Sequence, residues 1–149
     1  EKIVLVGPGG LGAKRGPMEE MVRRTSDMSN YQVLEAHKKN LGILMFANSS
    51  NIDDLSLYIQ LQNTKQHRTK SRPISATDTL TIILSKQKVP LFVLWGEKDS
   101  TVGPYLEDRM IILRKVNPNV RFHVEINAGH WIMYEKPERF NEVLINILN

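Results

Sequence analysis

The chain has 149 residues, of which 41% are hydrophobic and 24% charged, a balance typical of one globular domain. Its formal net charge is +4 at pH 7, and it contains no run of 18 apolar residues that would predict a membrane span. It has no cysteine, which excludes disulfides and thiolate metal sites. We therefore expect no bound metal, no cofactor, no contact with membranes, and a reducing, cytoplasmic location.

Residues 1–16 are predicted to form a strand and its exit. Ile3–Val6 is continuously apolar, as in a strand that is covered on both faces. The following Gly7-Pro8-Gly9-Gly10-Leu11-Gly12 matches the G-x-G-x-x-G pattern, in which backbone N–H groups bind a dinucleotide pyrophosphate. That pattern requires a helix, which Gly16 and Pro17 would interrupt. A glycine-rich exit over the top of a sheet is therefore favoured, and a dinucleotide-binding domain is the remote alternative.

Residues 17–86 are predicted to be mostly helical. Four helical stretches are expected, at 18–24, 31–39, 53–61 and 73–84. Pro17 and Asn30 favour helix starts before the first two, and apolar residues recur at helical spacing in the last two. Asn40 and Gly42 interrupt this pattern, and residues 41–47 are expected to form a further short helix. The whole region is expected to be one inserted helical unit.

A basic cluster lies at residues 65–72 and contains Lys65, Arg68, Lys70 and Arg72. Such clusters can bind nucleic acid, but this one has no aromatic side chain on which a base could stack. We interpret it as a solvated loop or helix end. The expected partner is a small-molecule substrate and not a nucleic acid.

Residues 87–149 are predicted to alternate strand, helix, strand and helix. The strands are expected at 90–95 and 120–126, and the helices at 105–116 and from Pro137 onward. This order predicts parallel strands in an α/β fold. The strict alternation of residues 120–126 is typical of an edge strand with one open face.

One acid and one imidazole follow these two strands directly. Asp99 comes after the first strand and His130 after the second, 31 residues later. Because the carboxyl ends of adjacent parallel strands meet at one sheet edge, we expect the two side chains to lie together. A carboxylate there can orient the imidazole, whose other nitrogen can act as a general base. Glu97 is the rival acid, and His37, His67 and His123 are interpreted as structural or surface residues.

Three motifs resemble the α/β-hydrolase superfamily. Residues 89–99 resemble its acid loop, residues 126–131 its histidine loop, and residues 134–140 the start of its last helix. The opening strand with its glycines, and Trp131 after the histidine, resemble the meta-cleavage product hydrolases, which break carbon–carbon bonds. The resemblance implies the C-terminal part of that fold, with about three parallel strands, flanking helices and a helical cap over residues 17–86. It implies catalytic roles for Asp99 and His130 and substrate binding by Trp131.

The chain departs from this family at two points. No serine here lies in the G-x-S-x-G context of the nucleophile, which precedes this region in the family. The expected helix at 53–61 also lacks the arginine that the subgroup's cap usually offers to a substrate carboxylate.

These departures leave two functional hypotheses. The first is a serine-type hydrolase that acts on an ester or on a C–C bond of a meta-cleavage-type diketo acid, with its N-terminal half absent and this chain inactive alone. The second is a non-catalytic binding module of the same fold, and the residue at the nucleophile position would decide between them. The open edge of Ile3–Val6 predicts pairing with the absent half or a homo-oligomer.

Overall fold

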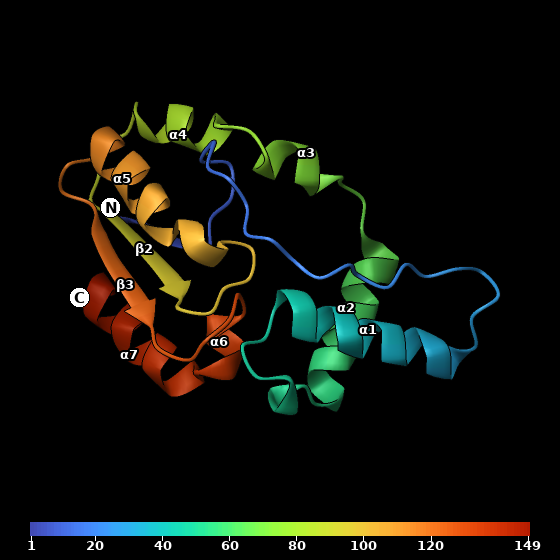
Figure 1. Ribbon diagram of the computed structural model, residues 1–149. Helices are drawn as coiled ribbons and strands as arrows, with labels where there is room; N and C mark the ends of the chain where they lie inside the picture. Colours follow the sequence, from blue (N-terminus) through green and yellow to red (C-terminus); the bar gives the residue numbers. More distant parts are fainter.

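A three-stranded parallel sheet organises the computed structural model, which describes residues 1–149 (Figure 1). β1 (Ile3–Val6), β2 (Leu91–Gly96) and β3 (Arg121–Glu125) lie side by side in that order. Both pairs of neighbouring strands are parallel. The predicted α/β class, the parallel order and the edge position of the last strand are thus confirmed. β1 is the other edge strand, and its residues are half-buried instead of fully covered.

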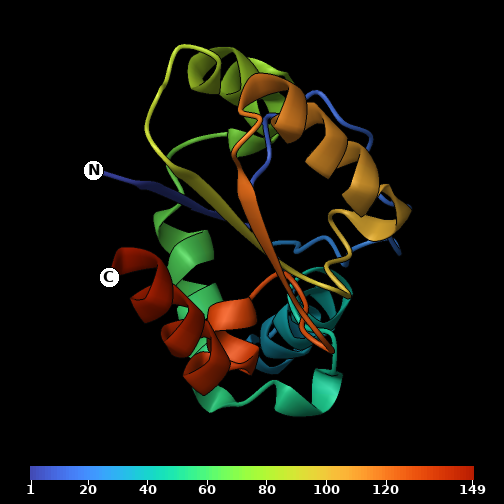
Figure 2. The same cartoon turned by 90° about the vertical axis from the view of Figure 1, so that its left-hand side faces the viewer.

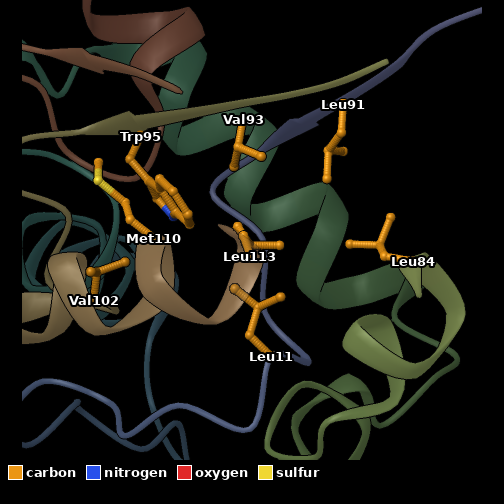
Figure 3. Packing of buried hydrophobic residues seen from close by; sticks show 8 residues of the cluster. All are labelled: Leu11, Leu84, Leu91, Val93, Trp95, Val102, Met110 and Leu113. Atoms are coloured by element: carbon orange, nitrogen blue, oxygen red, sulfur yellow. The ribbon is translucent and has the colours of Figure 1, made fainter. Parts of the chain in front are cut away.

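Helices cover both faces of this sheet. The side chains of β2 point alternately to one face and the other, so both faces are apolar and pack against helices. Leu91, Val93 and Trp95 point toward the face that α4 (Thr79–Leu84) and α5 (Leu106–Val116) cover. Figure 3 shows this cluster, in which Leu113 of α5 is fully buried; its other members are Leu11, Leu84, Val102 and Met110.

The opposite face packs against the C-terminal helices, as Figure 2 shows. Leu94 of β2 contacts Ile132 of α6 (Ile132–Glu135), and the apolar residues of α7 (Pro137–Leu148) pack around them. These residues are Phe140, Val143 and Ile147, which lie on the apolar stripe expected from the sequence.

The chain between β1 and β2 carries the inserted helices, and we call its residues 17–86 the insertion. Its main helices are α1 (Asn30–Leu44) and α2 (Asp54–Gln66), joined through a 3-10 turn at Ser49–Asn51. They lie beyond the carboxyl ends of β2 and β3 (Figure 1). The short α3 (Ser71–Ser75) leads back to α4, whose Leu80 and Leu84 join the sheet core.

The prediction of a helix at 18–24 is wrong. These residues have no regular secondary structure. The side chain of Asn40 binds the backbone of Val22 within this segment. Its Oδ1 accepts from the Val22 N–H at 2.8 Å, and its Nδ2 donates to the Val22 carbonyl at 2.9 Å. A tertiary contact therefore satisfies backbone groups that a local helix would otherwise pair.

The expected break at Asn40 and Gly42 is wrong as well, since α1 continues through both to Leu44. Leu41 between them is fully buried, so packing stabilises the helix at this point. A Cβ on Gly42 would lie 3.6 Å from the Ser49 side chain, an ordinary van der Waals distance, so the following turn lies beside α1.

The glycine run after β1 does not form a dinucleotide site. No helix follows β1 before Asn30. The N–H groups of Gly10 and Gly12 donate to the carbonyls of Ser75 and Thr77 at 2.8 and 2.9 Å. The donors that would bind a pyrophosphate are therefore paired with the end of α3 and the loop after it, and the remote alternative is wrong.

The basic cluster at residues 65–72 spans the end of α2, the connection that follows, which holds Arg68 and Lys70, and the start of α3. Its four cationic side chains are all exposed, as expected for a solvated segment. No helix in the structure combines the length and apolar character needed to cross a membrane.

Replacing Asn40 by Ala should release the 18–24 segment from α1. We expect the free energy of unfolding to fall by about 0.5–1.5 kcal/mol, because the partly buried backbone groups of Val22 lose their hydrogen-bond partners. Urea unfolding measures this loss. Asn63→Ala, at an exposed position of α2, is the control because it makes the same change in helix propensity. An equal effect of the two substitutions would contradict the role given to Asn40.

Candidate active site

Two loops meet where β2 and β3 end. The N–H of Glu97 donates to the carbonyl of Glu125, and the N–H of Lys98 donates to that of Ala128, both at 2.9 Å. Gly96 makes this approach possible, since a Cβ there would lie 2.2 Å from the Gly129 carbonyl oxygen. The sheet thus continues into two hydrogen-bonded loops, one carrying an acid and the other an imidazole.

Asp99 and His130 form a hydrogen-bonded pair between these loops. Nδ1 of His130 donates to Oδ2 of Asp99 at 2.8 Å. The Asp99 side chain is 1% exposed, whereas that of His130 is 26% exposed. Nε2 of His130 makes no hydrogen bond within the chain. The predicted juxtaposition is therefore present, with one ring nitrogen held and the other available.

Thr101 completes the surroundings of the carboxylate. Its N–H and its Oγ1 donate to Oδ1 of Asp99 at 2.9 and 2.7 Å. Burial by itself raises the pKa of Asp99, but the hydrogen bond and charge of His130 and the two bonds from Thr101 outweigh it, so the pKa is lowered. Asp99 is consequently ionised at neutral pH and can stabilise an imidazolium.

Gly7, the first residue after β1, lies against the imidazole. Its φ is +54°, and a Cβ there would lie 2.8 Å from Cε1 of His130. Any other residue would be strained by the backbone and would collide with the ring. The position after the first strand therefore requires glycine, both for its backbone conformation and for the space beside the imidazole.

Arg109 is a buried charge that the sequence analysis missed. It is 5% exposed and donates to three backbone carbonyls, those of Lys14, Thr101 and Tyr105. Burial lowers its pKa, which the negative charge of Asp99 partly offsets. The sequence gave no sign that Arg109 is buried, because an arginine on the helix at 105–116 is indistinguishable from a solvated surface charge.

A cavity of about 350 Å³ lies beside His130. Thr101 and Gly7 line it from the sheet side, and α3 contributes Arg72. Arg15, from the segment after the glycines, lies in the same wall. The sequence analysis looked for a cap arginine on the helix at 53–61. The arginines in the cavity wall come instead from α3 and from the segment after the glycines.

The other candidate residues lie apart from the pair. Glu97 is exposed, and its Oε2 accepts from the Asn127 N–H at 3.0 Å, so it does not bond to His130. The indole of Trp131 packs against the rings of Phe46 and Tyr134, with centroids 5.7 and 6.0 Å away. It does not line the cavity beside His130, and its substrate-binding role stays a prediction.

The remaining histidines do not bond to the pair. His37 is buried in α1, where burial and then the charge of Arg24 lower its pKa. His123 bonds to Glu125, and His67 is exposed. The structure contains no group of three or more histidine or carboxylate side chains placed to hold a metal ion.

Known proteins resemble this chain in sequence and in fold. A 2-hydroxy-6-oxo-6-phenylhexa-2,4-dienoate hydrolase from Burkholderia cepacia is 29% identical over 157 residues, which cover 99% of this chain and 54% of that protein. No protein-family model matches the chain. The chain spans about half the length of the curated relative, so the relative's activity belongs to a longer polypeptide.

Solved structures agree on the fold. A candidate aryl esterase from Burkholderia cenocepacia superposes with a TM-score of 0.73 at 22% identity, over 99% of this chain and 54% of that chain. A meta-cleavage product hydrolase from Pseudomonas fluorescens superposes with a TM-score of 0.67 at 19% identity, over 100% of this chain and 56% of that chain. The chain therefore has the α/β-hydrolase fold and is related in sequence to the meta-cleavage product hydrolases.

Proposed function

We propose that these 149 residues supply the base and the orienting acid of a serine-type hydrolase. The observation that carries the proposal is the bond of 2.8 Å between His130 and the buried Asp99, with Nε2 of His130 left available. Two such groups at adjacent strand ends match the acid and base of a catalytic triad. Asp99 holds the ring in the tautomer whose Nε2 can accept a proton.

The nucleophile of this proposed enzyme lies outside the 149 residues, since no serine of the chain bonds to His130. Nε2 of His130 would take the serine proton during attack on a substrate carbonyl and would return a proton to the leaving group. Asp99 would stabilise the imidazolium formed in between. Backbone N–H groups beside the nucleophile would stabilise the oxyanion.

The cavity favours an acidic substrate. Arg15 and Arg72 place positive charge in its wall. The related hydrolase from Burkholderia cepacia is named for a dienoate, which is a carboxylate. We therefore favour cleavage of a C–C bond in a meta-cleavage-type diketo acid over hydrolysis of a neutral ester. In this proposal the insertion acts as the cap that closes the cavity over the pair.

Comparing two lengths of the protein tests the proposal directly. The 149-residue chain should not turn over a diketo acid or an activated ester, whereas the chain extended by the sequence that precedes Glu1 in its gene should do so. Spectrophotometric turnover assays measure both. Equal activity of the short chain would overturn the assignment of the nucleophile to residues outside it.

Replacing Asp99 by Asn in the extended protein should lower kcat by about 10⁴-fold, because the imidazole loses the acceptor that fixes its tautomer. The control is Glu97→Gln, which changes the rival acid of the same loop and should keep activity within about threefold, as for exposed positions outside a site. Steady-state kinetics give both values. The reverse ranking would assign the acid to Glu97.

The same Asp99→Asn variant should also reveal the carboxylate in the pH dependence of stability. Because folding lowers the pKa of Asp99, its contribution is fully present above the unfolded value of about 3.9 and is lost as the pH falls through the lower folded value. The stability difference between wild type and variant should therefore be constant from pH 5 to 7 and shrink below about pH 4. Urea unfolding across this range measures it, and a difference that grows in acid would contradict the lowered pKa.

Replacing Arg72 by Gln should raise KM for a diketo acid by about 10-fold or more, because a hydrogen bond to a charged group is lost. A neutral ester should be turned over as by the wild type. Arg68→Gln is the matched control, since Arg68 is exposed and does not line the cavity. An equal rise of KM for both substrates would argue against recognition of the carboxylate by Arg72.

A further inference from the structure

Glu135 in α6 lies where the histidine loop meets the insertion. Its Oε2 accepts a hydrogen bond from the N–H of Gly129 at 2.6 Å. The same carboxylate accepts from the N–H groups of Ala47 and Asn48 at 3.0 and 3.1 Å, and from Nδ2 of Asn51 at 3.4 Å. Backbone groups far apart in the sequence thus converge on one side chain.

The close packing of the two segments explains why an acceptor is needed there. A Cβ on Gly129 would lie 2.6 Å from the nitrogen of Ala47, so the two backbones are in direct contact. Both segments direct N–H groups toward the same place, and backbone donors that are left without a partner destabilise the fold. The Glu135 carboxylate satisfies them together, with the added strength of a charged acceptor.

The same part of the insertion also contacts the acid loop. Ser100, which follows Asp99, donates from Oγ to the carbonyl of Leu44 at 3.1 Å. On the histidine side, the N–H of Trp131 donates to the carbonyl of Met45 at 2.9 Å. Residues 44–48 therefore bond to the loops that carry both members of the pair.

We infer that Glu135 is a positioning residue, which fixes the place of His130 by bonding the histidine loop to residues 44–48. Gly129 directly precedes His130, so a shift of its backbone moves the imidazole relative to Asp99. Displacements of about 1 Å at a reacting group can lower a rate by 10²-fold. This role in catalysis rests on the proposed function, whereas the coupling of the insertion to the histidine loop does not.

Glu135→Gln tests the coupling without any assay of activity. It keeps the size of the side chain but replaces one acceptor oxygen by a donor. In the 149-residue chain, we expect the low-field proton resonance of His130 Nδ1–H to shift or broaden and hydrogen exchange at Gly129 to accelerate at least about 10-fold. Glu138→Gln, at an exposed position in the first turn of α7, is the control and should change neither. An unchanged His130 resonance in Glu135→Gln would overturn the inference.

The wild type decides the matter if Glu135→Gln does not fold. Amides that donate to the same carboxylate should open together. The N–H groups of Gly129, Ala47 and Asn48 should therefore exchange with the same free energy of opening. Clearly different values would mean that the two segments open independently and would refute the coupling.

Kinetics separate this inference from the proposed function. In the extended enzyme, Glu135→Gln should lower kcat by about 10- to 100-fold and change KM by less than about threefold, because it disturbs the base and not the cavity wall. A wild type without turnover, but with the coupled exchange intact, would refute the hydrolase proposal alone. Unchanged kcat in an active enzyme would refute the positioning role alone.

Discussion

The contact between the loops after β2 and β3 is the constraint on which the site depends. Parallel pairing brings the carboxyl ends of the two strands together, and Gly96 lets the following backbones approach within hydrogen-bonding distance. Asp99 and His130 are carried on these loops and need little further adjustment to meet. Their geometry follows from the pairing of the two backbones.

The insertion is part of this arrangement and does not merely lie above it. Tyr134 of α6 donates to Asp53 at 2.5 Å, at the N-terminus of α2. Burial, and then the bond and charge of Asp53, raise the pKa of Tyr134 to about 12, so the phenol stays protonated and keeps donating. With the aromatic contacts of Phe46, these bonds make the chain after His130 and the insertion one packed unit.

The pairing of Asp99 with His130 was accessible from the sequence because both residues follow strands with a strong apolar pattern. The strand and helix order of residues 87–149 was correct for the same reason: local periodicity and the core agree there. The insertion was harder to predict. The expected helix at 18–24 gave way to the side chain of Asn40, and the break expected at Gly42 gave way to the packing around Leu41. In both places a distant contact overrides local propensity.

The sequence by itself determined the fold class, the parallel strands and the approach of the acid loop to the histidine loop, since these depend on periodicity and on which residues follow each strand. Only the tertiary structure decided what surrounds the pair. It selected Asp99 over Glu97, placed Gly7 under the imidazole, buried Arg109 beside the acid loop and joined the histidine loop to the insertion through Glu135. Each of these contacts joins residues that are distant in the chain, and spacing along a sequence carries no information about which distant groups will meet.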